Sequence, residues 1–491
     1  MSLRVLLFAD RAVRPRRARM VMVSALAVSL AATTGATPAA ATTPAAATPA
    51  AWRGAAELRA DQRVELGVDQ RVELGEELRR LARKLVDAGA PGVIVRVDDG
   101  RGTPVEIAEQ APWTRPDHLL KAGDEFRMGS NTKTMMATLV LQLAAEGRLA
   151  LTDPVEKWLP GKVPGGEAIT LRMLLNHTSG LYDYTEDPAI RPSFLGTDRR
   201  RWTSAKLLAL GVKHDPLFEP GRGWSYSNTN YAAIGAVLEQ ATGTGLADLV
   251  RDRIARPLGL DHTYYATDPT WRGPHARGYE PDAAHMPPGV PAAFRHVAGT
   301  RRHGNVDVSG NGPGWGGAAG AVVSTARDWS RFYRALMSGR LLPAAQLAQM
   351  RTTVPVDPKR PDGPGYGLGV QTGPHPCGTF WGHDGGMPGY LTANLTDRAG
   401  GRTASVLVST EFWSEFAADP KIAEAAGELQ TAVTCAMFGK PAPPAPSAAV
   451  PPPAPSVPSV PPAPSAPPAP PAPSAPTVRP APTVPSAPPE G

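Results

Sequence analysis

FRMGSNTKTMMATLVLQLAAEG, residues 126–147, sets a serine three residues before a lysine at the start of an apolar segment: Ser130 and Lys133. The apolar run predicts a helix over residues 134–146. Side chains three residues apart in a first helical turn lie on one face, so the amine of Lys133 can reach the hydroxyl of Ser130. An adjacent base of this kind turns a serine hydroxyl into a nucleophile. Ser-Asn-Thr before a helix is also ordinary capping chemistry, so a nucleophile and a helix cap are both open interpretations of Ser130.

The first residues of the chain have the composition of an export signal. Residues 1–41 contain a basic run, then thirteen mostly apolar residues, Met20–Ala32, then small residues. This order is typical of a secretory signal peptide and predicts a secreted or extracytoplasmic protein. Thirteen apolar residues are too few to span a bilayer, which needs about 20, so no transmembrane segment is expected. Without this segment the formal net charge falls from +6 to +1, which does not indicate nucleic-acid binding.

Two further segments lack the pattern of a folded core. Residues 42–75 are rich in Ala, Thr and Pro at first and then repeat DQRVELGV as DQRVELGE. We expect a low-complexity linker there, and the repeat is a local duplication in that linker or in a helix that leads into the domain. From residue 441 to 491, 23 of 51 residues are proline. Such a tail cannot form a core and favours extended polyproline II. It is either a spacer that associates the protein with the cell wall or a disordered tail without a role.

Residues 76–440 have the size of one catalytic domain. Apolar spacing predicts a helix over residues 75–89, and GVIVRVDD, residues 92–99, predicts a strand. The middle of the domain is mostly helical in pattern, and its last part alternates like antiparallel strands before a closing helix. An α+β fold follows: an antiparallel sheet shared by the two ends of the domain, flanked by N- and C-terminal helices, with a mostly helical region inserted. The further helices predicted in the insertion cover residues 171–176, 204–211 and 229–242.

A second polar group stands before another predicted helix. In PGRGWSYSNTNYAAIGAVLEQATG, residues 220–243, Tyr226 and Asn228 lie on a loop at the helix start. A tyrosine beside a lysine can relay protons, and an asparagine amide can hold both a lysine and a substrate carbonyl. A buried tyrosine and a turn asparagine are the structural alternative.

A third group lies in FWGHDGGMPGY, residues 380–390, where His383-Asp384-Gly385-Gly386 is expected to end one strand and turn toward the next. Glycines at such a place allow close approach of a substrate backbone and a backbone hydrogen bond to an oxyanion. A lone histidine in a glycine turn is otherwise structural or an incidental metal ligand. No second His, Cys or acidic residue stands at metal-ligand spacing, so no metal and no cofactor are expected.

The three groups together carry a resemblance to a known family. Ser-x-x-Lys at 130–133, Tyr-x-Asn at 226–228 and His-x-Gly at 383–385 resemble the motifs of the penicillin-recognising serine hydrolases. This family contains serine D-alanyl-D-alanine carboxypeptidases, class C β-lactamases, and related esterases and D-aminopeptidases. LLNHTSGLYDY, residues 174–184, resembles the same family. The resemblance covers roughly residues 78–441 and implies a β-lactamase/DD-peptidase-like fold.

The resemblance implies a role for each matching residue. Ser130 would be the acyl-enzyme nucleophile, and Lys133 and Tyr226 would be its acid/base pair, with the residue that takes the serine proton left open. Asn228 would orient Lys133 and the substrate amide. His383 would be catalytic by closing the site electrostatically.

The substrate cleft follows from the same resemblance. The backbone N–H groups of Ser130 and Gly386 would form the oxyanion hole. Trp315 would wall the cleft, and Asp384 and Gly385 would contact the substrate along the strand.

Two positions depart from the pattern of the carboxypeptidases. Threonine usually follows the His or Lys of the third motif and a hydroxyl often stands two residues later, but here these places hold Asp384 and Gly386. Gln371 stands about where secreted carboxypeptidases tend to carry an arginine for the terminal carboxylate of the substrate. A free D-alanine carboxylate would therefore meet an acid and lose a cation, at a cost of about 4 kcal/mol for one misplaced charge at about 4 Å and an effective dielectric constant near 20.

The expected function is that of an exported serine hydrolase, foremost a D-alanyl-D-alanine carboxypeptidase-type peptidase acting on peptidoglycan stem peptides. β-Lactams are expected to acylate the same serine. The same site could instead serve an esterase, a D-aminopeptidase or a β-lactamase acting on a small acyl substrate. An alternative from another class is a catalytically silent wall-binding protein.

The chain contains only two cysteines, Cys377 and Cys435. A pair in an exported protein favours one disulfide, and two buried free thiols are the alternative. The cysteine-bearing stretches also resemble those of secreted DD-carboxypeptidases, which supports the bridge. We expect a monomer.

Overall fold

The computed structural model describes residues 68–287, 290–411 and 420–443. The predicted signal peptide, residues 42–67 of the predicted linker and residues 444–491 of the predicted tail lie outside the described residues. In the described part of the chain, no helix combines the length and the apolar character needed to cross a membrane.

An eight-stranded antiparallel sheet forms the centre of the domain, and the two ends of the domain share it as predicted. Strand β1 (Gly92–Asp98) pairs on one side with β2 (Val105–Gln110) and on the other with β14 (Thr403–Val408). The order continues through β13 (Tyr390–Thr396), β12 (Phe380–Met387), β11 (Gln371–Gly373), β10 (Gly365–Tyr366) and β9 (Val354–Pro355).

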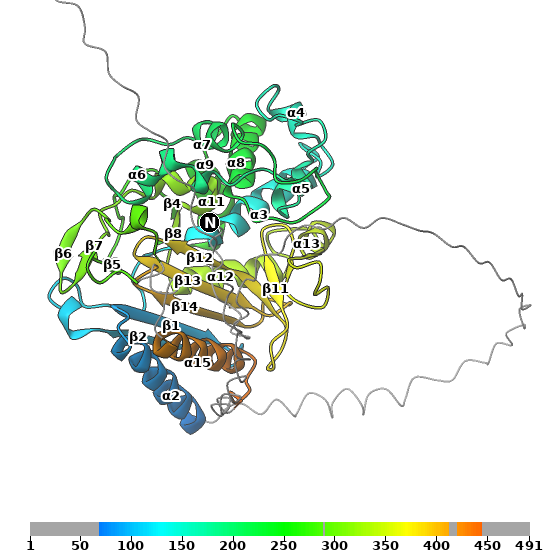
Figure 1. The fold of residues 1–491 in the computed structure, drawn as a ribbon. Coiled ribbons are helices and arrows are strands. Elements are labelled where there is room, and N and C mark those ends of the chain that lie inside the picture. Colours follow the sequence, from blue (N-terminus) through cyan, green and yellow to red (C-terminus); the bar gives the residue numbers. More distant parts are fainter. Residues whose placement is uncertain (1–67, 288–289, 412–419, 444–491) are drawn as a thin grey trace, which may run out of the picture. The chain divides into compact units, whose positions relative to one another are not determined.

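The helices at the two ends of the domain cover one face of this sheet (Figure 1). They are α2 (Val68–Asp87) and α15 (Pro420–Met437). Alternate residues of β1 explain why both faces are buried, since Val93 and Val95 pack toward the terminal helices while Ile94 joins the core on the opposite face.

Helix α2 begins earlier than the sequence indicated. Residues 68–75, for which a linker and a lead-in helix were both open, are helical. The second copy of the repeat is held against the domain, because Leu74 packs against the core beneath α2 and Arg71 pairs with Asp99 at 3.6 Å. Arg71 also donates a hydrogen bond to the carbonyl of Thr103.

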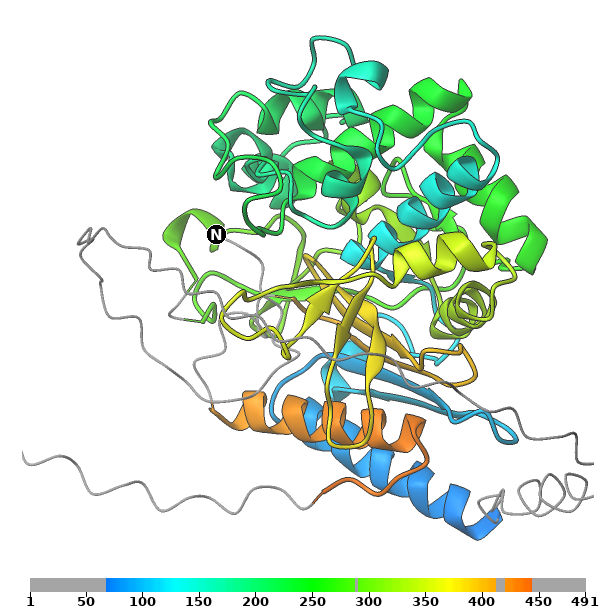
Figure 2. The ribbon, with the colours of Figure 1, turned by 90° about the vertical axis from the view of Figure 1, so that its right-hand side faces the viewer.

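The inserted helical region lies on the other side of the sheet (Figure 2). Its central helices are α3 (Thr132–Ala145) and α8 (Asn228–Thr242), both within two residues of their predicted bounds. Most residues of α3 are buried, which its almost continuously apolar sequence predicts for a core helix. The remaining helices are α4 (Val155–Trp158), α5 (Leu171–Leu175), α6 (Arg191–Phe194), α7 (Ser204–Gly211), α9 (Leu246–Val250), α10 (Arg256–Leu258), α11 (Gly317–Gly320), α12 (Ala326–Met337) and α13 (Ala344–Met350).

Two small antiparallel sheets accompany the main one. One contains β3 (Phe126–Arg127), β8 (Val322–Ser324) and β4 (Tyr264–Tyr265), and it leads the chain into the turn that carries Ser130. The other contains β5 (Tyr279–Pro281), β7 (Asn305–Asp307) and β6 (Thr300–Arg302).

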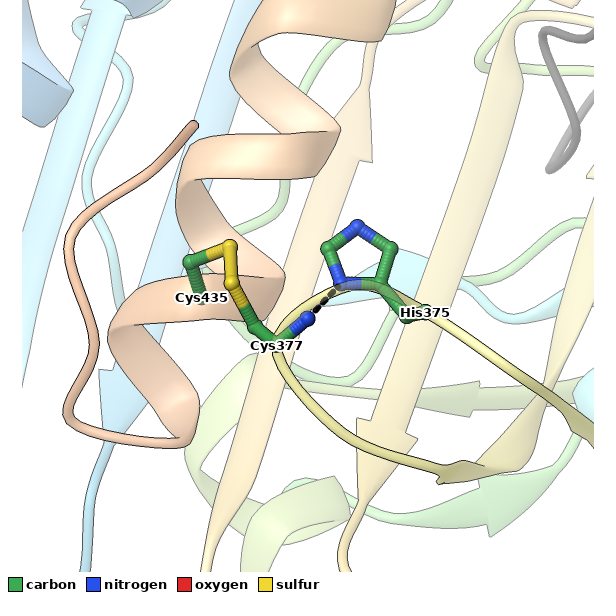
Figure 3. Close-up of side chains that lie close together, drawn as sticks. All are labelled: His375, Cys377 and Cys435. Atoms are coloured by element: carbon green, nitrogen blue, oxygen red, sulfur yellow. Dashed lines mark hydrogen bonds between the residues drawn. A yellow bond between two sulfur atoms is a disulfide. The ribbon is translucent and has the colours of Figure 1, made fainter. Parts of the chain in front are cut away.

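A disulfide joins the segment after β11 to helix α15. Cys377 and Cys435 are bonded, with Cα atoms 5.1 Å apart, and His375 lies beside them, where its Nδ1 accepts a hydrogen bond from the Cys377 N–H (Figure 3). In the described residues this trio is the one group of three side chains with metal-ligand spacing. Both sulfurs are bonded to each other and offer no thiolate to a metal ion.

Candidate active site

Ser130 lies on a tight turn at the entrance to α3. The turn is a 3-10 helix over Gly129–Asn131, and Asn131 is the N-cap residue of α3. Ser130 is thus not the cap of that helix, and its hydroxyl oxygen lies within hydrogen-bond distance of the Lys133 amine. The positive φ of Gly129, 51°, lets the chain turn from β3 into this helix.

Lys133 is the buried partner of Ser130. Its side chain is fully buried, and its Nζ lies 3.1 Å from Ser130 Oγ, 2.8 Å from Asn228 Oδ1 and 2.9 Å from the carbonyl oxygen of Ala319. Burial lowers the pKa of Lys133 to about 7, against the opposing charges of Asp183 and Asp384. An amine with such a pKa can exchange a proton with a hydroxyl near neutral pH.

Asn228, the first residue of α8, links Lys133 to a carboxylate that the sequence analysis did not single out. Its Nδ2 donates to Asp183 Oδ2 at 3.0 Å and Oδ1 at 3.3 Å, while its Oδ1 accepts from Lys133. Asp183 also accepts the Thr185 N–H as N-cap of the 3-10 helix Tyr184–Glu186. An Asp before a short helix is an ordinary cap signal, and its second contact depends on the fold.

Tyr226 lies over Lys133 at the cavity wall. The Lys133 Nζ is 4.7 Å from the centre of the Tyr226 ring. Desolvation raises the pKa of Tyr226 well above its ordinary value, and a hydrogen bond with Ser130 opposes this. The ring also packs on His177, with ring centres 4.4 Å apart. His177 is a fully buried residue without a predicted role, and its Nδ1 accepts from the Ser227 N–H.

The His-Asp-Gly-Gly group lies within strand β12 and not at its end, contrary to our prediction. The chain turns only after Met387. Alternation along the strand separates His383 from Asp384: the histidine is fully buried, and the aspartate lines the cavity. His383 Nδ1 donates to the carbonyl of Asp384 at 2.5 Å, and its Nε2 lies 2.8 Å from the Tyr366 hydroxyl. Its ring centre is 6.4 Å from that of Tyr226.

Glycines bring β12 directly against the turn of Ser130. A Cβ atom on Gly385 would lie 2.1 Å from the Met128 carbonyl oxygen and 2.8 Å from the Ser130 nitrogen, and one on Gly129 would lie 2.8 Å from the Gly386 nitrogen. The two backbone N–H groups predicted to form an oxyanion hole, those of Ser130 and Gly386, thus belong to segments in van der Waals contact.

Asn131 and Thr392 tie these two segments together. Asn131 Nδ2 donates to Thr392 Oγ1 at 2.7 Å and to the Met128 carbonyl at 2.9 Å. Thr392 in turn donates to the carbonyls of Gly385 and Met128, at 3.1 and 3.2 Å. This buried network connects the Ser130 turn to β12 through β13, and no sequence motif indicated it.

Gln371 and Asp384, which both depart from the carboxypeptidase pattern, contact each other. Gln371, on β11, donates through Nε2 to Asp384 Oδ1 at 3.0 Å. Both line a cavity of about 700 Å³ that also contains Ser130, Tyr226 and the wall formed by Trp315. The cavity further contains Asn228, Gly385 and Gly386, whereas Lys133 and His383 lie behind its lining.

Three comparisons relate the chain to known proteins. A family model described as Beta-lactamase matches residues 78–427. A D-stereospecific amidohydrolase from Streptomyces sp. has a solved structure with 37% sequence identity and a TM-score of 0.61, covering 72% of this chain and 98% of that one. Penicillin-binding protein 4* of Bacillus subtilis is 29% identical over 58% of this chain and 59% of its own length.

The D-alanyl-D-alanine-carboxypeptidase/endopeptidase AmpH of Escherichia coli is 31% identical over 37% of this chain and 47% of its own length. The chain therefore spans about half to three-fifths of the length of these two curated relatives. The monomeric state that we expected stays a prediction.

Proposed function

The chain belongs to the beta-lactamase family of serine hydrolases, and from this premise we propose that it cleaves peptide or amide bonds that follow a D-amino acid, through an acyl-enzyme on Ser130. One observation carries the proposal: Lys133 Nζ is held 3.1 Å from Ser130 Oγ by two fixed oxygen acceptors, in surroundings that lower its pKa to about 7.

In acylation, Ser130 Oγ forms a bond to the substrate carbonyl carbon and its proton passes to the neutral amine of Lys133. We assign the base role to Lys133 because desolvation raises the pKa of Tyr226, which keeps its phenol protonated. Tyr226 then donates its proton to the leaving nitrogen as the C–N bond breaks, and Lys133 reprotonates it. The N–H groups of Ser130 and Gly386 stabilise the oxyanion.

Deacylation repeats these steps with water. The water oxygen bonds to the ester carbonyl carbon, its proton moves through Tyr226 to Lys133, and the bond to Ser130 Oγ breaks. Lys133 returns the proton to Ser130, and the product leaves as a carboxylic acid.

For the substrate, the proposal keeps peptidoglycan stem peptides ending in D-alanyl-D-alanine, and β-lactams as acylating ligands of the same serine. The similarity to a penicillin-binding protein and to a carboxypeptidase supports this class. Export through the predicted signal peptide would bring the protein to that substrate.

Asp384 favours a second candidate, a substrate whose group at this place is neutral or cationic. Its carboxylate lines the cavity, and its partner Gln371 is neutral. An amide or ammonium group would be accepted there at no electrostatic cost, whereas a terminal carboxylate would be repelled. The similarity to a D-stereospecific amidohydrolase supports this candidate.

A matched pair of peptides tests both candidates: diacetyl-L-lysyl-D-alanyl-D-alanine and the same peptide with a C-terminal amide. Wild type should cleave at least one, and a folded Ser130→Ala variant neither; activity retained in that variant would end the nucleophile assignment. Asp384→Thr should raise the ratio of carboxylate to amide cleavage at least tenfold, and an unchanged ratio would remove the role of Asp384.

The esterase and β-lactamase alternatives are tested in the same series with a p-nitrophenyl ester and a chromogenic cephalosporin. A folded wild type that cleaves none of these compounds, and that a fluorescent penicillin does not label, would favour the silent wall-binding protein.

A further inference from the structure

Asp183 contacts Asn228, which in turn contacts Lys133, and it takes no part in the proposed reaction. Its carboxylate is half-buried, and its two oxygens accept hydrogen bonds from the Asn228 amide and from the Thr185 N–H. Asp183 and Asn228 come from segments that are far apart in the sequence, because Asp183 follows α5 and Asn228 begins α8.

The carboxylate determines which way the Asn228 amide points. An ionised carboxylate only accepts hydrogen bonds, so the NH2 group of Asn228 must face Asp183 and its oxygen must face Lys133. An ammonium on Lys133 would demand the same orientation. A neutral amine would not, because it can also accept a hydrogen bond, and in that state Asp183 alone prevents the amide from flipping.

The orientation of the amide decides where the lone pair of Lys133 points. A neutral amine has two N–H bonds and one lone pair. The Asn228 oxygen and the Ala319 carbonyl each accept one hydrogen, which leaves the lone pair directed at Ser130. If the amide flipped, its NH2 group would take the lone pair, and Ser130 would lose its base.

We propose that Asp183 is a positioning residue of this site, which locks the Asn228 amide so that the neutral amine of Lys133 presents its lone pair to Ser130. The inference deepens the proposed function and rests on it, since it needs Lys133 as the base.

The charge of Asp183 has a second effect, because it favours the protonated form of Lys133. Burial lowers the pKa of Lys133, and the Asp183 charge opposes that change. Burial also raises the pKa of Asp183 itself, so this opposition is present only above that raised value. The other titratable groups that face Lys133 are Asp384 on β12, His177 after α5, Tyr226 before α8 and Tyr231 on α8. His383 on β12 and Tyr366 on β10 lie near the ring of Tyr226.

The amide orientation and the charge of Asp183 together predict a change in the pH profile of acylation that a merely structural residue would not produce. Asp183→Asn keeps the shape and an acceptor for Thr185 but removes the charge. The acylation rate at its alkaline plateau should fall about ten- to a hundredfold, the loss expected for one charge-assisted hydrogen bond. The midpoint of the acid limb should move toward lower pH by about one unit, the order of shift expected when one opposite charge on the far side of the Asn228 amide is removed in partly solvated surroundings.

Asp187→Asn is the matched control. Asp187 caps the next 3-10 helix, Pro188–Ile190, in the same way, but its carboxylate pairs with Lys213 and His214 instead of Asn228. In Asp187→Asn, the acylation rate at the alkaline plateau and the midpoint of the acid limb should equal those of the wild type. An equal change in both variants would mean that capping the loop, not positioning Asn228, is what matters.

The experiment measures labelling of the full chain by a fluorescent penicillin between pH 5 and 9. Independently of activity, the 13Cε shifts of labelled lysine give the titration of Lys133, assigned by comparison with Lys133→Arg. A midpoint that does not move in Asp183→Asn overturns the inference even if Ser130 remains the nucleophile. Wild type that is labelled at a residue other than Ser130 would instead overturn the proposed function.

If Asp183→Asn does not fold, Asp183→Ser replaces it, because serine still caps Thr185 but is too short to hold Asn228. The same shift of the Lys133 midpoint is expected there, and its absence counts against the inference in the same way.

Discussion

Gly385→Ala tests whether the reaction depends on the close packing of β12 against the Ser130 turn. The new methyl group would lie 2.1 Å from the Met128 carbonyl oxygen, 2.8 Å from the Ser130 nitrogen and 2.8 Å from Asn131 Nδ2. Two of these three atoms belong to the backbone, so the strand and the turn must separate by about 1 Å to restore ordinary contact.

This separation should affect rate more than stability. A shift of about 1 Å between the two proposed oxyanion donors, the N–H groups of Ser130 and Gly386, should cost on the order of a hundredfold in kcat. Overpacking of this size costs about 1–3 kcal/mol of unfolding free energy. The Thr392 hydrogen bonds to both segments resist the separation, which favours the upper part of this range.

The assay compares kcat and KM of Gly385→Ala with those of Gly427→Ala, on whichever matched peptide the wild type cleaves. Gly427 lies inside α15, and a Cβ there would meet no atom within 4 Å. The control should keep full activity and gain about 0.5–1 kcal/mol of stability, because alanine favours a helix interior over glycine. Wild-type kcat in Gly385→Ala would refute the argument that spacing of the two segments sets the oxyanion hole.

Three further predictions concern protonation, the disulfide and the support of His383. Because the pKa of Lys133 is lowered to about 7 and its neutral form is the proposed base, acylation should rise about tenfold per pH unit below about pH 7 and level off above it; a flat profile from pH 5 to 9 would contradict this. Replacing Cys377 by serine together with Cys435 should cost about 4 kcal/mol by the loop-entropy model, seen in urea unfolding, and no loss would mean that the bridge constrains little. Tyr366→Phe leaves the buried Nε2 of His383 without its hydroxyl partner and should cost about 1–3 kcal/mol in the same measurement, whereas unchanged stability would show that this contact adds nothing.

Local pattern was sufficient for the elements that build the domain. The strand predicted over residues 92–99 is β1, Gly92–Asp98, and the helix predicted over residues 134–146 is α3, Thr132–Ala145. The α+β class, with a sheet shared by both ends and a helical insertion, is confirmed. Periodicity reports which face of an element is buried, and that information is local.

Local pattern was misleading where contact with a distant segment of the chain determines the conformation of a residue. Gly385 and Gly386 indicated a turn, but β12 continues through them. Glycine stands at position 385 because the Ser130 turn leaves no room there for a side chain. The repeat left a linker and a lead-in helix open, and in the structure Leu74 and Arg71 hold residues 68–75 in a helix against the domain.

Residue type, spacing and periodicity are properties of short segments, so they were enough to predict the fold class and the kinds of groups in the site. How those groups act on one another depends on tertiary packing. It buries Lys133 and so lowers its pKa, it pairs Gln371 with Asp384, and it brings Asp183 to Asn228. These effects depend on distance and on exclusion of water, which arise when segments that are far apart in the chain pack together.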